Sequence, residues 1–577
     1  MNKVILDGDS LTLDDFIGVS RLDREVSLSD NAINKITDSR KIVEKIVDSG
    51  IPSYGVNTGF GANSSIPISK EKADRLQENI IRSHSAGLGD AYSDEVVRGA
   101  LLLRVNCFAA GYSGVRLELV NTLINMLNKG VIPIVPSRGS VGSSGDLAPL
   151  AHTALPIIGL GKAKYAGEVL DGREAMFRAG IPILPFSYKE GLAFTNGFAF
   201  GTSLGAQSLY ESIRIADNAD IVAAMLVESL AGITKAYRDE LQLVRPHKSQ
   251  IQCAKNMLNL LDGSTIIDAE GKFNVHSAYS IKSVPQVLGS LRTAIDHLED
   301  IIQTEINSAT DNPLFFNNFE SGDYSLSGSN FHGQIIGNAL AYLGIGLASV
   351  FKNLNGLVTR AIDEKLSDGL PPFLTNENGL NSGFMVSQYT LGSLYNEVSA
   401  LTTPLVVDNV STCASAEDVV SMGTNQARNL YKITELAYEA LAIGLISATQ
   451  GLYFRQNGNT RDRAELVKRF GCEMLIAADK NEDINNEILT IVDQYQKERN
   501  QLPVKVTLGS GTSKVYQSVV NQLTQAGFDM PYEDSKQPIH LWIELGVKIL
   551  KDDKLRVICE PEFKNTADYM ANIRKSY

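Results

Sequence analysis

Cysteine is scarce in this chain of 577 residues, and its five thiols are widely separated. No CxxC pair occurs, so we expect neither a disulfide framework nor a cysteine-based metal site. An odd, scattered set of thiols is typical of reduced cysteines, which places the protein in the cytoplasm. The five are Cys107, Cys253, Cys413, Cys472 and Cys559.

We also expect no export signal and no apolar membrane span, and the chain has no excess of positive charge. The start, MNKVILDGDSLTLDDF, carries acids where a signal peptide would be apolar. No run of roughly 18 residues is both apolar and free of charge. The nearest candidate, 440–450, has charged flanks and is predicted to be a buried helix. The net charge of −13 argues against nucleic acid or an anionic membrane as the main partner.

Several long stretches lack proline and carry few charges, and the spacing of their apolar residues predicts helices. Helices of this length and composition must bury more than one face, as they do when packed in a bundle. We therefore predict a mainly α fold built on long helices. The stretches are 93–129, 205–233, 337–366 and 430–452.

The amino-acid composition and the spacing of apolar residues change along the chain and predict three regions. Residues 1–205 hold most of the glycine-rich turns, and residues 206–499 hold most of the long helical stretches. Beyond 455 the chain becomes polar, as in QNGNTRDR and KNED, and VKVTLGSGTSK and KLRVICEPEF alternate as strands do. We predict that residues 500–577 form a small mixed α/β extension of unknown role.

The stretch GSVGSSGDLAPLAH, residues 139–152, places two serines between glycines and an acid. Taken alone, it fits a turn or a helix N-terminus, with Asp146 in the first helical turn. A serine hydrolase is poorly supported, because the nucleophile elbow has the pattern G-x-S-x-G and the second spacer is missing here.

In full, this stretch resembles the signature of the histidine, phenylalanine and tyrosine ammonia-lyases and their aminomutase relatives. The resemblance runs from near the start to about residue 455, and further motifs follow in the order of that family. They are YGVNTGFG (54–61), IRSHSAGLGD (81–90), GYSGVRLEL (111–119), KEGLAFTNG (189–197), RPHKSQ (245–250), AYSIKSVPQ (278–286), SATDNPLFF (308–316), SNFHGQ (329–334), GLPPFL (369–374), LNSGFM (380–385) and AEDVVSMG (416–423).

The resemblance implies a cofactor that the chain makes from its own residues. In the family, an Ala-Ser-Gly triplet cyclises and loses two waters to give 4-methylidene-imidazol-5-one (MIO), which here would form from Ser143, Ser144 and Gly145. Ser144 would lose its hydroxyl, and the nitrogen of Gly145, free of side-chain crowding, would attack the carbonyl of residue 143. Ser143 departs from the usual alanine, and its own hydroxyl is predicted to be dispensable.

Four further residues match catalytic or pocket positions of the family. By resemblance, Tyr54 is the base that removes the β-proton, and Asn196 and Tyr279 are hydrogen-bonding neighbours of the MIO. Phe331 would line the pocket beside it. A phenol has a pKa of about 10, so a tyrosine base near neutral pH needs a lowered pKa. Without the resemblance, Tyr54 is more simply a packed tyrosine, Asn196 part of a capped turn and Phe331 a core residue.

Two positions near Tyr279 depart from the family pattern. Lys282 stands where relatives have an arginine that grips the substrate carboxylate, and lysine lacks the two-pronged geometry of arginine. His276 stands where relatives have glutamine. Either the carboxylate and amino end of the substrate are bound in an unusual way, or the two changes are drift in a loop.

The substrate is indicated by His84 and Glu417. Ser83-His84 resembles histidine lyases, although some tyrosine lyases and tyrosine aminomutases share the pair. Histidine lyases also have a glutamate where Glu417 stands, and an anionic acceptor suits a ring that carries an N–H. The glutamine and histidine that flank this glutamate in histidine lyases are missing here.

We therefore expect an ammonia-lyase that converts an aromatic amino acid to an α,β-unsaturated acid, with histidine to urocanate favoured and tyrosine second. An aminomutase, which returns the ammonia to the β-carbon, and a paralogue that has lost the chemistry are the alternatives. By resemblance the protein is a homotetramer, with residues 1–205 bearing the MIO and residues 206–499 joining subunits and completing the active site.

Overall fold

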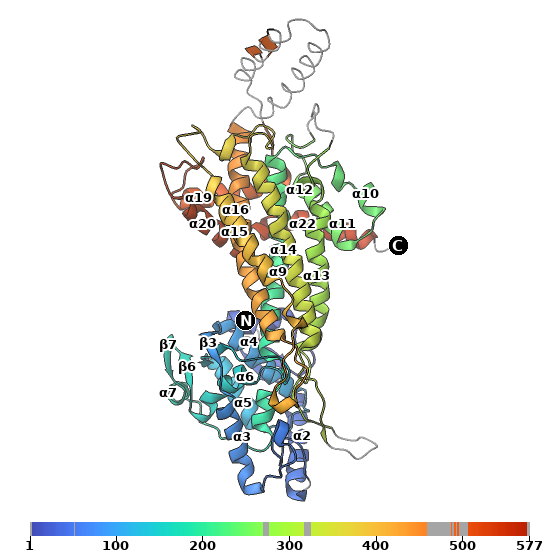
Figure 1. The fold of residues 1–577 in the computed structure, drawn as a ribbon, viewed down its shortest axis with the longest axis vertical. Helices are drawn as coiled ribbons and strands as arrows, with labels where there is room; N and C mark the ends of the chain where they lie inside the picture. Colours follow the sequence, from blue (N-terminus) through green and yellow to red (C-terminus); the bar gives the residue numbers. More distant parts are fainter. Residues whose placement is uncertain are drawn as a thin grey trace. The chain divides into compact units, whose positions relative to one another are not determined.

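Helices dominate the computed structural model of the chain, in agreement with the predicted fold class (Figure 1). The structure describes residues 3–50, 52–268, 276–316, 325–457, 486, 490–491, 493–494 and 506–573. Most of QNGNTRDR, all of KNED and Cys472 lie outside these residues. The other four cysteines are free thiols.

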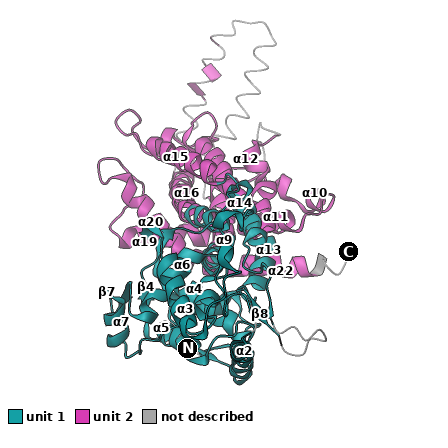
Figure 2. Cartoon of the chain, turned by 60° about the horizontal axis from the view of Figure 1, so that its bottom comes forward, with its two compact units in different colours: residues 1–210, 296–344, 402–432 teal, residues 211–295, 345–401, 433–577 magenta. Residues whose placement is uncertain are grey.

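The contacts within the chain divide it into two compact units, each assembled from separate parts of the sequence (Figure 2). Unit 1 comprises residues 1–210, 296–344 and 402–432. Unit 2 comprises residues 211–295, 345–401 and 433–577. Segments that are distant in the sequence therefore meet within each unit.

Four long helices contribute residues to both units. They are α9 (Ala199–Ser229), α13 (Val284–Glu305), α14 (Gln334–Ile362) and α16 (Gly423–Asn457). Three of them confirm the predicted long stretches. Within unit 2, a Cβ added at Gly444 of α16 would lie 2.8 Å from Val222 of α9 and 2.9 Å from Leu354 of α14. Glycine at this position thus lets three helices approach closely.

Unit 1 adds shorter helices and small sheets. Its helices are α1 (Leu13–Leu22), α2 (Asp30–Ser49), α3 (Lys70–His84), α4 (Asp94–Ala109), α5 (Leu117–Lys129), α6 (Leu147–Ala154), α7 (Gly172–Arg178) and α8 (Glu190–Thr195), with 3₁₀ turns η1 (Gly61–Asn63) and η6 (Cys413–Ser415). Its strands are β1 (Val4–Leu6), β2 (Val26–Leu28), β3 (Leu88–Ala91), β4 (Ile132–Pro133), β5 (Pro136–Arg138), β6 (Lys162–Tyr165), β7 (Glu168–Asp171), β8 (Leu314–Phe315) and β9 (Ser325–Leu326).

These strands form two- and three-stranded sheets. β1 pairs in parallel with β2, and the antiparallel pairs are β3 with β5, β4 with β6, β6 with β7, and β8 with β9. The predicted helical stretch 93–129 is in fact two helices, α4 and α5. The chain breaks between them because Gly111 and Gly114 adopt φ of +83° and +68°, outside the right-handed helical region.

Unit 2 adds helices on both sides of α13 and α14 in the sequence. They are α10 (Asp239–Leu243), α11 (Lys248–Leu260), α12 (Tyr279–Lys282), α15 (Met385–Leu401), α19 (Ser510–Gln525), α20 (Ile539–Lys551), α21 (Lys554–Ile558) and α22 (Glu560–Ile573).

The expected strands in the C-terminal extension are wrong for the residues that the structure describes. Ser510–Gln525 and Lys554–Ile558 are helical, as is the rest of KLRVICEPEF from Glu560 onward. The apolar pattern there follows a helical period: Leu555 and Cys559, four positions apart, are buried, whereas Val557 between them is 63% exposed. The sequence of such a short run fits both the two-residue alternation of a strand and the 3.6-residue period of a helix.

Among the residues that the structure describes, one helix, α14, is long and apolar enough to cross a membrane by length and composition. The sequence predicts a long helix over 337–366, but the stretch considered there as the nearest candidate membrane span was 440–450. Of the most apolar window of α14, 61% is buried inside the structure, and a core helix passes the same test.

Candidate active site

The GSVGSSGDLAPLAH stretch forms a tight loop that leads into α6. Asp146 is the N-cap residue of this helix, and Ser143 and Gly145 before it are buried. Gly145 has a φ of +81°, in the left-handed region that favours glycine. A Cβ at this position would lie 2.1 Å from the carbonyl oxygen of Gly197 and 2.6 Å from its nitrogen. No side chain can therefore replace the hydrogen of Gly145 without moving the backbone.

Backbone hydrogen bonds fix the loop against the turn that follows α8. The amide of Asp146 donates to the carbonyl of Gly197 over 2.8 Å, and the amide of Gly197 donates to the carbonyl of Ser144 over 3.2 Å. The Asp146 carboxylate accepts hydrogen bonds from the amides of Phe200 (2.8 Å) and Gly201 (3.0 Å) at the start of α9. Burial raises the pKa of Asp146, and these hydrogen bonds oppose that shift.

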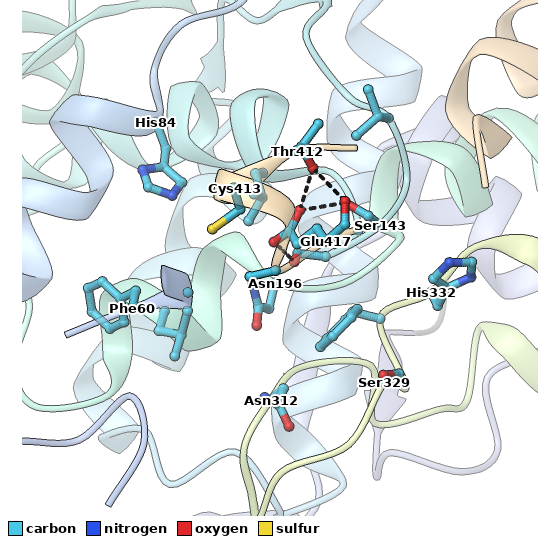
Figure 3. Close-up of a pocket in the computed structure, with 18 of the residues that line it drawn as sticks. Phe60, His84, Ser143, Asn196, Asn312, Ser329, His332, Thr412, Cys413 and Glu417 are labelled. Atoms are coloured by element: carbon cyan, nitrogen blue, oxygen red, sulfur yellow. Dashed lines mark hydrogen bonds between the residues drawn. The ribbon is translucent and has the colours of Figure 1, made fainter. Parts of the chain in front are cut away.

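The loop borders a cavity of about 1130 Å³ that lies within unit 1 (Figure 3). Its walls come from six parts of the sequence, within 54–64, 80–84, 139–147, 192–196, 312–332 and 412–419. They include Tyr54, Phe60, His84, Ser143, Ser144, Gly145, Asn196, Asn312, Ser329, Phe331, His332, Thr412, Cys413 and Glu417. Of the residues predicted for the site, the structure thus brings together the proposed MIO triplet, Tyr54, Asn196, His84, Phe331 and Glu417.

Glu417 reaches the two serines directly. The hydroxyl of Ser144 donates to its Oε1 over 2.6 Å, and the hydroxyl of Ser143 donates to its Oε2 over 2.8 Å. Thr412 donates to the same Oε2 over 3.1 Å (Figure 3). Hydrogen bonds from hydroxyls to a carboxylate are stronger than those between neutral groups. The carboxylate is therefore held at the loop by three hydroxyls.

Tyr54 lines the cavity, and its hydroxyl accepts a hydrogen bond from the amide of Gly61 over 3.3 Å. Burial raises the pKa of Tyr54, and nearby Glu417 and Cys413 add to the shift, while the Gly61 amide opposes it. This direction is opposite to the lowered pKa expected from the sequence. The physical reason is that water is excluded and the neighbouring charge is negative, and both disfavour a phenolate.

His84 lies at the end of α3 and lines the cavity. Burial lowers its pKa, although the charge of Glu417 opposes that effect. Its Nδ1 lies 3.0 Å from the hydroxyl of Ser83. Asn196 is buried at the end of α8, and Phe331 is half-buried. His84 and Glu417 thus present polar groups to the cavity (Figure 3). Phe331 also lines the cavity and adds an apolar ring.

Tyr279, Lys282 and His276 belong to unit 2 and are not among the residues that line the cavity of unit 1. They form a cluster of their own. The ammonium of Lys282 lies 3.1 Å from Nε2 of His276 and 4.6 Å from the centre of the Tyr279 ring. Tyr279 is 72% exposed. Since an ammonium can only donate, a hydrogen bond between the two requires an acceptor nitrogen on His276.

Several cavity residues were not foreseen from the sequence. Thr412 and Cys413 precede Glu417 on a turn whose ends are tied by Thr412 N to Glu417 O (2.8 Å) and by Glu417 N to Thr412 O (3.2 Å). Asn312 and His332 reach the cavity from loops around β8 and before α14. For Asn312 and His332 the signal was available, since they belong to the motifs SATDNPLFF and SNFHGQ. Thr412 and Cys413 lie outside the quoted motifs.

Comparisons with known proteins agree with this arrangement. Residues 11–471 match the family model "Aromatic amino acid lyase". A histidine ammonia-lyase from Caldanaerobacter subterraneus is 47% identical over 456 residues, which is 79% of this chain and 89% of the relative. The crystal structure of histidine ammonia-lyase from Trypanosoma cruzi superposes with a TM-score of 0.80 at 31% identity, covering 97% of this chain and 95% of that one.

A tyrosine aminomutase from Streptomyces globisporus is similar to the same degree. Its crystal structure has a TM-score of 0.80 at 30% identity and covers 97% of this chain and 99% of its own. The overall fold is therefore shared by proteins that carry different names and act on different amino acids.

Proposed function

The chain belongs to the aromatic amino acid lyase family, and on that premise we propose that it is a histidine ammonia-lyase that converts L-histidine to urocanate and ammonia. It is thus an enzyme of the carbon–nitrogen lyase class. The observation that carries the choice of substrate is Glu417, whose carboxylate lies in the same cavity as His84 and touches Ser144. A carboxylate at this point suits a ring with an N–H donor.

We propose that the chain forms MIO from Ser143, Ser144 and Gly145, and the local geometry fits this group. The Gly145 nitrogen would bond to the Ser143 carbonyl carbon with loss of one water, and Ser144 would lose its Oγ and its Cα hydrogen as a second. Gly145 sits in a cradle that a Cβ would fill, and its φ of +81° turns the loop sharply. The hydrogen bond from Gly197 holds the Ser144 carbonyl in place.

When formed, this group supplies an electrophilic carbon that takes up the substrate amine and makes ammonia a leaving group. The chain's own residues then do the rest. Tyr54 faces the cavity and takes the β-proton, which requires its phenolate form. Glu417 accepts the ring N–H, and His84, whose pKa is lowered by burial, offers a second polar contact in the same cavity.

In this proposal, the cluster of Tyr279, Lys282 and His276 joins an active site when several copies of the chain assemble. We propose that the protein works as a homotetramer in the cytoplasm, with an amino acid as its small-molecule partner and with no nucleic-acid or membrane partner. In that assembly the exposed Tyr279 and the half-buried Lys282 reach the cavity of a neighbouring copy, where the ammonium of Lys282 attracts the substrate carboxylate.

A tyrosine ammonia-lyase or a tyrosine aminomutase is the second candidate. The similarity to the tyrosine aminomutase structure supports it, as does the absence of the flanking glutamine and histidine, replaced here by Ala416 and Val419. Product analysis separates the candidates. Histidine gives urocanate, a tyrosine lyase gives an unsaturated phenolic acid, and an aminomutase gives a β-amino acid.

The experiment has two parts. The intact mass of the purified protein must fall short of its sequence mass by two waters, and an unmodified mass contradicts the proposed cofactor. Histidine, tyrosine and phenylalanine are then supplied separately, and the conjugated products are followed by absorbance. We expect the fastest product formation from histidine; an equal or faster rate with tyrosine contradicts the proposed substrate.

A further inference from the structure

The carboxylate of Glu417 is held unevenly by the hydroxyls around it. Its Oε1 accepts one hydrogen bond from Ser144, over 2.6 Å. Its Oε2 accepts two, from Ser143 over 2.8 Å and from Thr412 over 3.1 Å (Figure 3). The two oxygens of one side chain therefore depend on different donors.

Formation of the proposed cofactor removes only one of these donors. Ser144 loses its Oγ as water, whereas the side chain of Ser143 stays outside the ring that forms, and Thr412 takes no part. In the mature protein, Oε2 keeps its two hydroxyl donors and Oε1 loses the one that Ser144 supplied. This step of the reasoning rests on the proposed function, because it requires that the triplet cyclises.

We infer that Ser143 and Thr412 are positioning residues that hold Glu417 by Oε2 so that Oε1 is free to accept the ring N–H of the substrate. Ser143 is only 4% exposed, so few water molecules compete for its hydroxyl, and the hydrogen bond to the carboxylate is retained. A carboxylate fixed by two donors loses less rotamer freedom on binding than a free one. The hydroxyl of Ser143, predicted from the sequence to be dispensable, thereby gains a role in substrate choice.

The two donors come from different parts of the chain. Thr412 and Glu417 lie at opposite ends of one short turn, and Cys413, Ala414 and Ser415 between them all have positive φ, between +52° and +65°. The turn ties Thr412 to Glu417 but is itself exposed. Ser143, 274 residues away, anchors the carboxylate to the buried loop before α6. Once Ser144 has lost its hydroxyl, removal of the Ser143 hydroxyl leaves Thr412, on the same turn as Glu417, as the remaining donor of these three.

A double-mutant cycle between Ser143→Ala and Glu417→Gln tests this inference. We expect Ser143→Ala to keep the two-water mass deficit, because alanine is the usual residue of the family triplet, and to lower kcat/KM for histidine about tenfold, equivalent to about 1.4 kcal/mol. In the Glu417→Gln background the same change should cost much less than tenfold, since the anionic acceptor is already gone. Thr412→Val, which keeps the side-chain shape, should lower kcat/KM in the same direction.

Ser411→Ala is the matched control, because Ser411 is exposed immediately before this turn and its hydroxyl donates to Ser415 on the turn rather than to Glu417. It should leave kcat/KM unchanged. If Ser143→Ala matches the wild type, or if its effect simply multiplies with that of Glu417→Gln, the inference is overturned.

Measuring the cycle also on thermal stability separates this inference from the proposed function. If the wild type fails to turn over histidine, the proposed substrate is refuted, while a stability coupling between Ser143 and Glu417 still supports the positioning contact. If the wild type deaminates histidine but neither cycle shows coupling, the positioning role fails alone.

Discussion

Replacing Gly145 with alanine separates two costs that the structure assigns to this position. A left-handed backbone costs alanine about 1–2 kcal/mol relative to glycine. The second cost is steric, since the new Cβ would lie 2.1 Å from the Gly197 carbonyl oxygen and 2.2 Å from its carbon. Because backbone atoms cannot rotate away, the loop has to shift, and overpacking of this kind costs roughly 1–3 kcal/mol or more.

Gly167, in the turn between β6 and β7, isolates the first cost. Its φ is +85°, close to the +81° of Gly145, but a Cβ there would meet no atom within 4 Å. Gly167→Ala should therefore lose only the backbone term, whereas Gly145→Ala should lose both. Thermal or denaturant unfolding of the two variants measures the difference.

Intact mass gives a second readout of the same pair. Gly167→Ala should keep the two-water deficit, and Gly145→Ala should lack it, because the displaced nitrogen no longer meets the carbonyl of residue 143. The reasoning is refuted if Gly145→Ala is no less stable than Gly167→Ala and still shows the deficit.

Three further predictions concern the base, the core and the carboxylate grip. Burial raises the pKa of Tyr54 and the reaction needs its phenolate, so log kcat/KM should rise with pH from neutral into the alkaline range. Tyr54→Phe should lower activity about 10²–10⁴-fold. A pH profile of kcat/KM that is flat above pH 7 argues against this base. Lys189→Met, which leaves the fully buried Asp311 without its ion pair of 2.6 Å, should cost about 3–5 kcal/mol of unfolding free energy. Lys41→Met, in an exposed pair, should cost less than about 1 kcal/mol, and equal losses in the two variants would contradict the burial argument. Lys282→Arg should lower KM for histidine, because a guanidinium grips a carboxylate with two hydrogen bonds, and an unchanged KM would show that Lys282 does not meet the carboxylate.

The long helices could be predicted from the sequence because their signal is local. Apolar spacing over many residues indicated the stretches that became α9, α14 and α16, and the mainly α class follows from them. Short runs were less reliable. KLRVICEPEF reads as a strand by alternation, but burial of Leu555 and Cys559 follows the helix period, and only packing against neighbours decides between them.

The membership of the site was predicted better than its contacts. Motif resemblance indicated Tyr54, Ser144 and Glu417, and the structure places all three around one cavity. The hydrogen bond from Ser143 to Glu417 joins residues that are 274 positions apart in the sequence, and no periodicity or spacing links such distant positions. The raised pKa of Tyr54 likewise could not be predicted from the sequence, because it depends on burial and on the neighbouring carboxylate rather than on residue type.

The most direct test of the account compares the intact mass and the histidine turnover of the wild-type protein with those of Ser144→Ala. The wild type should be lighter than its sequence by two waters and should convert histidine to urocanate. Ser144→Ala, which has no hydroxyl to lose, should lack that deficit and the activity together. A wild-type mass equal to that of the sequence, or urocanate formation by Ser144→Ala at the wild-type rate, would contradict the central claim that this loop makes the electrophile.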